Sequence, residues 1–188
     1  MLDEHGLGEF LHAHYSRPGD QLFRMERLPL YDVPSQNADR DAFLRGVAPD
    51  WARKQAWLDE LAENARRGMV SRRVRVFSAQ LSDDELMSCH YGYPYIGRDQ
   101  DIRVVHPGEH PVPTLLDHDY WIAEPLDGGG VHVARMHYTD GGAFVGAEPI
   151  DGPGQDVYLR ERDLAWQAAE PFNTWWARHG ELHRTVAT

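Results

Sequence analysis

Hydrophobic residues recur with the period of an α-helix in several stretches of the chain, and each stretch carries signals that mark helix ends. In one of them Asp50 stands at the N-cap position, Leu58 lies on the apolar face and Gly68 ends the pattern. A second begins at Ser82, which has the spacing of a capping box with Glu85. We expect helices over residues 4–15, 50–68, 82–93 and 155–169, with a further turn after Pro171.

Short runs rich in Val, Phe and Tyr, bounded by Gly or Pro, are typical of β-strands. We expect five strands, over residues 72–78, 101–106, 119–124, 131–138 and 143–149. The separators LDGGG and TDGG are hairpin signals, so the last three strands are predicted to form an antiparallel meander. Residues 21–28 alternate as far as Pro29, and we interpret them as a strand or an extended arm.

The order of these elements predicts an α/β or α+β fold, in which helices cover a mixed sheet of about five strands. We place an N-terminal helix and extended arm in residues 1–48, packed as an appendage on an α/β core domain in residues 49–178. Residues 179–188 form a predicted tail.

The amino-acid composition is that of a globular protein with a hydrophobic core. The chain has 188 residues, of which 41% are hydrophobic, and this is enough for a core without disulfides or a structural metal. The single cysteine, Cys89, lies late in a predicted helix, where a buried structural thiol is expected rather than a nucleophile. No run approaches the roughly 18 apolar residues of a membrane helix, and the first residues lack a signal-peptide pattern. We therefore expect a cytoplasmic protein without a membrane partner.

Charge excludes one further class of partner. The formal net charge is −11, and residues 95–188 carry 7 basic against 15 acidic residues. An acidic surface repels phosphate backbones, so direct nucleic-acid binding is not expected. Glycine-rich phosphate loops, nucleophile elbows and established metal motifs are missing from the sequence, and we expect no cofactor and no metal.

Acidic and imidazole side chains gather in two neighbouring predicted strands. Asp117, His118 and Asp119 lie at the start of one strand, and His137 and Tyr138 end the next. Such groups could pair as acid and base, which makes Asp119, His118 and His137 the candidate catalytic residues of an enzyme. The alternative is ordinary turn chemistry, because Asp is common before strands and in TDGG turns.

A dense run of basic residues joins a predicted helix end to a predicted strand. Its five arginines are Arg66, Arg67, Arg72, Arg73 and Arg75. These arginines could bind an anionic ligand or a partner protein. The alternative is a solvent-exposed cluster that caps the end of the helix. For the first reading we name Arg73, Arg75, Asp117 and Tyr138 as ligand-binding residues for a small anion.

The end of the chain is rich in tryptophan. Tryptophan is enriched where proteins bury surface against partners, so Trp175 and Trp176 are candidate interface residues of a homodimer. The alternative is that this Trp-rich segment completes the core.

Several segments carry a resemblance to a known family. They are LFRMERLPLYDVP, RRVRVFSAQLSDDE, QDIRVV, LLDHDYWIAE, ARMHYTDGGAFVGAE and RERDLAWQAAEPFNTWW. Over residues 22–176 the chain resembles an actinobacterial family of unknown function whose genes commonly lie beside helix-turn-helix regulators, which implies a helix-turn-helix regulator as partner.

The order of elements also resembles a half-domain of the phospholipase-D-like fold. The catalytic signature of that fold is His-x-Lys, but the only lysine is Lys54, and no histidine stands two residues before it. The resemblance therefore implies a non-catalytic relative.

Two hypotheses about function follow. The first is a cytoplasmic regulatory or accessory protein that binds a small anionic ligand or a helix-turn-helix protein. The alternative is a small-molecule enzyme with its site at Asp117, His118, Asp119 and His137, in which arginines hold an anionic substrate.

Overall fold

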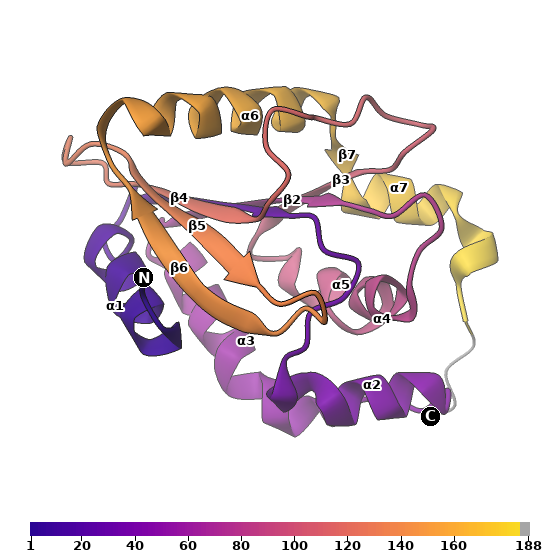
Figure 1. Cartoon of the computed structure of the whole chain (residues 1–188). Coiled ribbons are helices and arrows are strands. Elements are labelled where there is room, and N and C mark those ends of the chain that lie inside the picture. The colour runs from indigo at the N-terminus through magenta and orange to yellow at the C-terminus, as the bar shows by residue number, and fades with distance from the viewer. Residues whose placement is uncertain (185–188) are drawn as a thin grey trace.

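A single mixed β-sheet organises the computed structural model, which describes residues 1–184. Its seven strands lie in the order β6-β5-β4-β1-β2-β3-β7 (Figure 1). The strands are β1 (Gln21–Glu26), β2 (Val70–Val76), β3 (Asp101–Val105), β4 (Tyr120–Glu124), β5 (His132–Tyr138), β6 (Phe144–Ile150) and β7 (Glu170–Pro171). The mixed α/β class is confirmed, whereas the prediction of about five strands was too low, because β1 and β7 belong to the same sheet.

The sheet has a parallel part and an antiparallel part. The strands β1, β2 and β3 run parallel, and helical crossovers connect them, as parallel neighbours require. The strands β4, β5 and β6 pair antiparallel in sequence order, which confirms the predicted meander. The meander joins the parallel part where β4 pairs antiparallel with β1.

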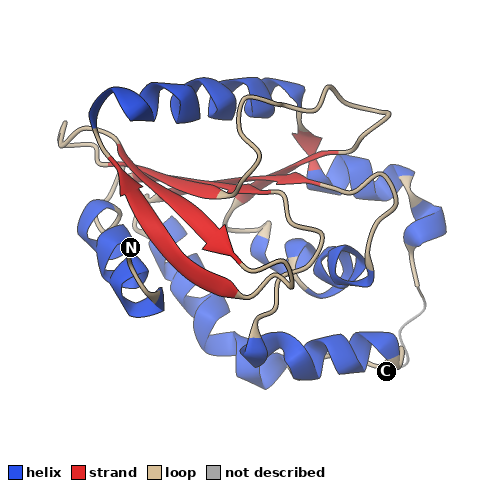
Figure 2. Cartoon of the chain, viewed as in Figure 1, coloured by secondary structure: helices blue, strands red, loops and turns tan. Residues whose placement is uncertain are grey.

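Helices cover both faces of the sheet (Figure 2). They are α1 (Glu4–His14), α2 (Asn37–Leu44), α3 (Trp51–Arg66), α4 (Asp83–Tyr91), α5 (Tyr93–Ile96), α6 (Gln155–Ala168) and α7 (Phe172–Arg178). The helix α6 lies along one face, while α1, α3, α4 and α5 lie on the other (Figure 1). We call these the α6 face and the α4 face.

The predicted helix ends agree with the structure. The Asp50 side chain accepts a hydrogen bond from the Ala52 amide at the start of α3. Gly68 follows that helix with a φ of 84°, the left-handed conformation that glycine adopts without a Cβ clash. Ser82 and Glu85 form both hydrogen bonds of the capping box of α4.

The segment before residue 49 differs from the expected appendage. The strand β1 is hydrogen-bonded to β2 on one side and to β4 on the other, so it lies inside the sheet and not on its surface. Its side chains Phe23 and Met25 belong to the core beneath α6. The interpretation of residues 21–28 as a strand is therefore correct, and the arm reading is wrong. Of the predicted tail, residues 180–182 form a 3-10 turn and residues 185–188 lie outside the described residues.

Within residues 1–184, no helix combines the length and the apolar character needed to cross a membrane.

Candidate functional site

Charged side chains enter the α4 face of the sheet from its two central strands. On β1 they are Arg24 and Glu26, and on β2 they are Arg73 and Arg75. Alternation along a strand explains the arrangement, because the neighbours Phe23, Met25 and Val74 point to the α6 face. The register places Arg24 beside Arg73 and Glu26 beside Arg75. We call Arg24, Arg73 and Arg75 the arginine cluster.

Glu26 is the carboxylate at the centre of this cluster. Its Oε1 lies 2.9 Å from Arg24 Nη2 and 3.0 Å from Arg73 Nη1, and its side chain is only 5% exposed. Burial alone would raise the pKa of Glu26, but Arg24, Arg73 and Arg75 together lower that pKa to about 2. Tyr93 of α5 donates a hydrogen bond to Glu26 Oε2 over 3.5 Å. Glu26 is therefore ionised at neutral pH.

Arg75 is almost completely buried but only partly paired. Its Nη2 donates to the Leu28 carbonyl and lies 3.5 Å from Glu85 Oε1. Glu85 also accepts hydrogen bonds from the amides of Ser78 and Ser82, so it is shared between Arg75 and the start of α4. Within the described residues 1–184, the Nε and Nη1 atoms of Arg75, and Nε of Arg73, are buried without a hydrogen-bond partner.

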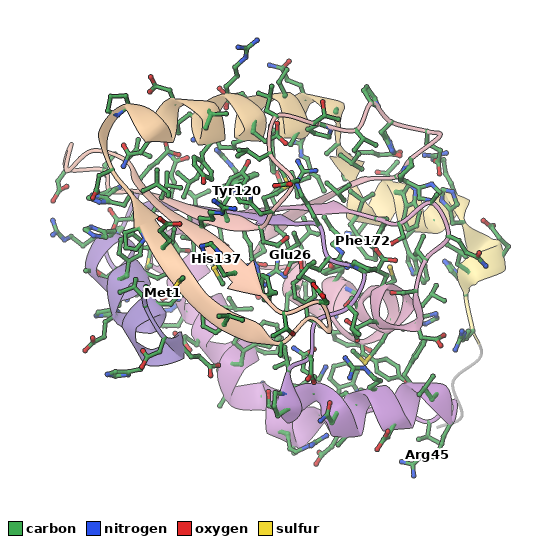
Figure 3. All side chains as sticks on the ribbon, in the orientation of Figure 1. Met1, Glu26, Arg45, Tyr120, His137 and Phe172 are labelled. Atoms are coloured by element: carbon green, nitrogen blue, oxygen red, sulfur yellow. The ribbon has the colours of Figure 1, made fainter. Side chains whose placement is uncertain are left out.

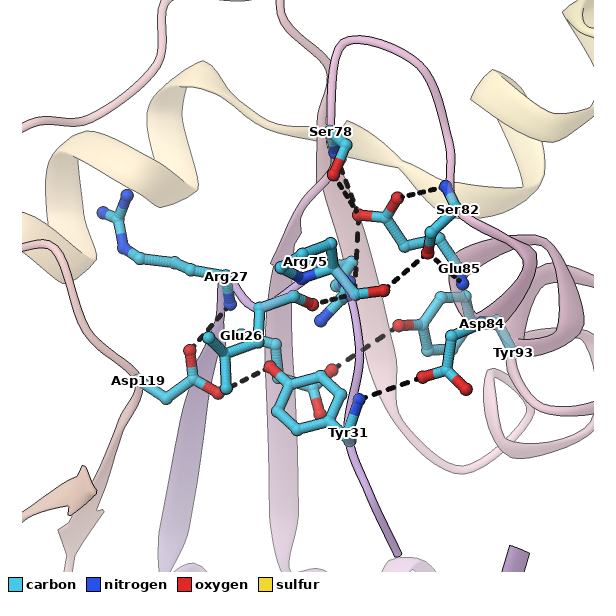
Figure 4. Close-up of polar contacts among 12 residues, drawn as sticks. Glu26, Arg27, Tyr31, Arg75, Ser78, Ser82, Asp84, Glu85, Tyr93 and Asp119 are labelled. Atoms are coloured by element: carbon cyan, nitrogen blue, oxygen red, sulfur yellow. Dashed lines mark hydrogen bonds and ion pairs between the residues drawn. The ribbon is translucent and has the colours of Figure 1, made fainter. Parts of the chain in front are cut away.

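Residues 27–33, which we call the strap, cross over the cluster after β1 ends. The Arg27 amide donates to Asp119 Oδ1 over 2.8 Å, and the Tyr31 hydroxyl donates to Asp119 Oδ2 over 2.5 Å. Figure 4 shows both contacts, together with the bond from the Tyr31 amide to Asp84. The aromatic ring of Tyr31 has Arg75 Cζ at 5.0 Å and Arg24 Cζ at 5.9 Å from its centre. The strap thus places an aromatic ring against two guanidinium groups.

The remaining groups of the site are also shielded from water. Burial raises the pKa of Asp119. The hydrogen bond from Tyr31 and the positive charge of Arg24 both lower this pKa, but burial has the larger effect. Burial likewise raises the pKa of Tyr138, to about 12, although Arg24 lowers it in part. The rings of Tyr31 and Tyr138 meet edge to face, with their centres 5.6 Å apart. The phenols of the site are therefore neutral hydrogen-bonding groups at neutral pH.

The position of the site in the fold is a second reason to regard it as functional. The parallel strands β1 and β2 end side by side, and β4, which runs antiparallel to β1, begins at the same end of the sheet. In open α/β sheets ligands commonly bind outside the carboxyl ends of the parallel strands. Glu26 is the last residue of β1 and Asp119 directly precedes β4, so both lie at that end.

The arginine cluster is also expensive to bury. Transferring charged groups from water costs several kcal/mol each, and ion pairing often only compensates for this cost. Apolar residues of similar volume often stabilise a buried position at least as well as an ion pair does. The cluster is therefore a candidate for a role beyond stability.

The structure brings together three of the four predicted ligand-binding residues. Arg73 and Arg75 lie in the cluster, and Tyr138 contacts Tyr31 at its edge. The fourth, Asp117, is 99% exposed in its side chain and pairs with His118, so it lies apart from them. Of the other arginines in the predicted basic run, Arg66 pairs with Glu63 on the surface and Arg72 lies against Trp166.

The residues of the predicted acid–base site are divided between the two faces of the sheet. His118 bonds to Tyr158 of α6, and His137 pairs with Glu148 over 3.2 Å, on the α6 face. Asp119 points to the opposite face, where Tyr31 binds it. Figure 3 shows His137 in the meander, whereas Glu26 lies in the central strand β1. These residues do not form one site. Among residues 1–184 no group of three or more His, Cys, Asp or Glu is placed to hold a metal ion.

The two predicted interface residues lie in α7. Trp175 is fully buried against Phe77, so the expectation that it is available at a contact surface is wrong. Trp176 is partly buried and stacks on Phe172. The alternative reading, that this helix completes the core, agrees with the structure. Cys89 is buried as predicted, and burial raises the pKa of its thiol.

Sequence reasoning did not find four members of the site: Arg24, Glu26, Tyr31 and Glu85. The available signal was the presence of two charged residues, Arg24 and Glu26, that alternate with Phe23 and Met25. In a strand that is covered on both faces, such charges must be paired or functional. Glu85 was identified only as a capping residue.

A cavity of about 460 Å³ lies at the amino ends of β2 and β3, away from the cluster. Its walls include Ser71, Gln100 and Phe172, and neither Arg73 nor Arg75 lines it. It is a separate feature of the molecule.

Comparison with known proteins identifies a family but no reaction. The family model described as "Domain of unknown function (DUF6879)" matches residues 10–177. Neither the curated proteins nor the solved structures gave a match. The resemblance to the phospholipase-D-like fold and the helix-turn-helix partner therefore stay predictions.

Proposed function

We propose that this chain, which belongs to the DUF6879 family, is a ligand-binding protein of regulatory or accessory type that holds a small anion at the arginine cluster. The observation that carries the proposal is the partly unpaired state of Arg75, whose Nε and Nη1 atoms are buried without a hydrogen-bond partner among residues 1–184. A buried donor without a partner costs about 1–3 kcal/mol. A carboxylate or phosphate oxygen would accept these hydrogen bonds.

Two further features support the proposal. The site lies at the carboxyl ends of the central strands, where ligands of α/β proteins bind. The strap is the element between the cluster and solvent, since Pro29 and Leu30 are exposed while Arg75 beneath them is buried. An anion would therefore reach the cluster from the strap side.

The same features favour binding over catalysis. The carboxylates Glu26 and Glu85 are both held by arginine, and Glu26 has a pKa of about 2, which makes it a poor proton acceptor at neutral pH. The histidines of the predicted acid–base site lie on the other face of the sheet. We propose no reaction at either place.

The proposal is tested by calorimetric titration of the full chain with phosphate, sulfate, acetate and citrate at constant ionic strength. We expect saturable binding of at least one of these anions. Arg75→Met removes the free donors, and because a hydrogen bond to a charged group contributes about 1.5–3 kcal/mol, affinity should fall about 10- to 150-fold. Arg72→Met is the matched control, since Arg72 lies on the same strand but points to the α6 face.

Two results would contradict the proposal: no saturable binding of any of the anions, or equal affinity in wild type and folded Arg75→Met. If Arg75→Met does not fold, Arg24→Gln serves instead, because the Arg24 side chain is 22% exposed and less involved in packing. Weakened binding in that variant supports the proposal, and unchanged binding contradicts it.

A further inference from the structure

We infer that the ligand of the arginine cluster is a small aromatic anion whose ring carries a hydrogen-bond donor, and that Tyr31 occupies the position of that ring while the strap is closed. The inference rests on the proposed function and adds the chemical class of the ligand. It starts from the surroundings of the Tyr31 side chain.

Three side chains that contact the Tyr31 ring come from strands of the sheet. Arg24 of β1 and Arg75 of β2 face the ring, with Cζ atoms 5.9 Å and 5.0 Å from its centre. Tyr138 of β5 meets it edge to face. A guanidinium over an aromatic face and an edge-to-face aromatic contact are both selective for planar π-systems. The framework of the sheet thus forms a slot for an aromatic ring.

The far end of the slot recognises a hydrogen-bond donor. Asp119 is 2% exposed, and its Oδ2 accepts the Tyr31 hydroxyl over 2.5 Å. Its other oxygen is already taken by the Arg27 amide. Without a phenol in the slot, Oδ2 of a buried carboxylate would lose its partner. A ligand ring that lacks a donor would therefore bind less well than one that carries a hydroxyl group.

The slot also offers a place for negative charge. The unpaired Nε and Nη1 atoms of Arg75 belong to the guanidinium that faces the ring. The Tyr31 side chain carries no anionic group at neutral pH, because burial raises its pKa well above the ordinary value. Tyr31 therefore satisfies the aromatic and donor requirements of the slot and leaves the charge requirement unmet. An aromatic acid would satisfy all three.

Arg27 anchors the start of the strap through a buried ion pair with Glu161, whereas residues 28–32 are held by contacts that can be exchanged. Side chains of the surrounding framework bind its backbone: Arg75 to the Leu28 carbonyl, Ser82 to the Pro29 carbonyl and Arg40 to the Tyr31 carbonyl. One sheet-like bond joins the strap to the meander, from the Asp32 amide to the Gly142 carbonyl over 3.0 Å. Short side-chain contacts to a loop break more easily than a strand ladder. A ligand that replaces the Tyr31 ring would therefore displace the strap.

The first test compares three probes on the wild-type chain: 4-hydroxyphenylacetate, phenylacetate and cyclohexylacetate. Loss of the cation–π contacts should make cyclohexylacetate bind about 3- to 30-fold more weakly than phenylacetate. Loss of the bond to Asp119 should make phenylacetate bind about 10-fold more weakly than 4-hydroxyphenylacetate. Equal affinities for the three acids would overturn the inference. If simple anions still bind through Arg75 in that case, the proposed function stands and only the ligand class is wrong.

The second test follows the strap by hydrogen exchange. Ligands normally slow exchange near their site, but displacement of Tyr31 should speed exchange of the Tyr31 and Asp32 amides on addition of 4-hydroxyphenylacetate. The Met136 amide, which donates to the Asp119 carbonyl within the sheet, is the internal control and should not change. Binding that leaves the two strap amides equally or better protected would overturn the inference.

A variant completes the design. Tyr31→Phe keeps the aromatic ring but loses the hydrogen bond to Asp119. The side chain at position 31 should then compete less well with the ligand for the slot, so 4-hydroxyphenylacetate should bind several-fold more tightly than to the wild type. Tyr95→Phe, on α5, is the matched control and should bind as wild type does. Weaker or unchanged binding by Tyr31→Phe would contradict the competition between Tyr31 and the ligand.

Discussion

Glu85 links the start of a helix to the charge of the site. Its carboxylate closes the capping box of α4 through the Ser82 amide and also accepts the Ser78 amide, 2.9 Å away. The same carboxylate is the nearest counter-charge of Arg75 on α4, and it is fully buried. Removing Glu85 would therefore take away the carboxylate that α4 provides to Arg75, leaving Glu26 as its remaining carboxylate neighbour, and would also remove the cap of α4.

We predict that Glu85→Ala lowers the free energy of unfolding by about 3–5 kcal/mol, the cost of breaking a buried ion pair from one side. Glu85→Gln should cost less, because its amide oxygen can still accept the Ser78 and Ser82 amides. Urea unfolding followed by circular dichroism measures both. Glu60→Ala, on the exposed side of α3, is the control and should change stability by no more than about 0.5 kcal/mol. A loss below about 1 kcal/mol in Glu85→Ala would contradict the pairing.

At the scale of elements, the sequence predicted best where local chemistry decides the structure. The helices that begin at Asp50 and Ser82 follow from capping residues, and the meander follows from its glycine turns. The central position of β1 could not be predicted from the sequence. The strand is covered on both faces, but Arg24 and Glu26 give it the alternating pattern of a strand with one face in water. The strand β7 has only two residues, too few for any periodicity.

The site was predictable only in part for the same reason. The basic run of the sequence contains Arg73 and Arg75, but which of its arginines point inward depends on the pairing of β2 with β1. Tyr31 lies in a loop, and its contact with Asp119 joins residues 88 positions apart. Long-range register and loop placement come from tertiary packing, and a single sequence carries no local signal for either.

A pair of histidines forms part of the contact of α1 with the meander. The rings of His14 on α1 and His132 on β5 are stacked, with centres 3.5 Å apart. Burial, and then the neighbouring His132, lower the pKa of His14 below the ordinary value of 6.5. The folded state therefore binds protons less readily than the unfolded state, and stability is lost as the pH falls below about 6.5 toward the lowered pKa.

We predict that the melting temperature of the wild type falls more between pH 7.5 and pH 5.5 than that of His14→Phe. The variant keeps an aromatic ring between Phe10 and His132 but cannot be protonated. Differential scanning calorimetry at both pH values measures the difference. His5→Gln is the control, because His5 is 84% exposed in its side chain and its loss should leave the pH dependence unchanged. Identical pH dependence in wild type and His14→Phe would contradict the proposed effect.

At the scale of the whole molecule, β1 unites the two halves of the sheet. It is hydrogen-bonded to β2 over six residue pairs and to β4 over five. Without it, the sheet separates into β2-β3-β7 and β4-β5-β6, each with a newly exposed edge. The core beneath α6 also loses Phe23 and Met25, which are 3% and 0% exposed. The core domain expected over residues 49–178 therefore lacks a central strand.

A fragment of residues 49–188 is predicted not to fold. In this fragment the edges of β2 and β4 that pair with β1 in the full chain have no partner. Arg73 and Arg75 remain in the fragment, but the counter-charge of Glu26 is lost. Circular dichroism should show no cooperative thermal transition, and the amide resonances should be poorly dispersed. The matched control is a fragment of residues 16–188, which lacks α1, a helix without fully buried residues, and should still unfold cooperatively. A folded 49–188 fragment would show that β1 is an addition to a complete core, and it would remove the reason for placing a ligand site at the junction of β1, β2 and β4.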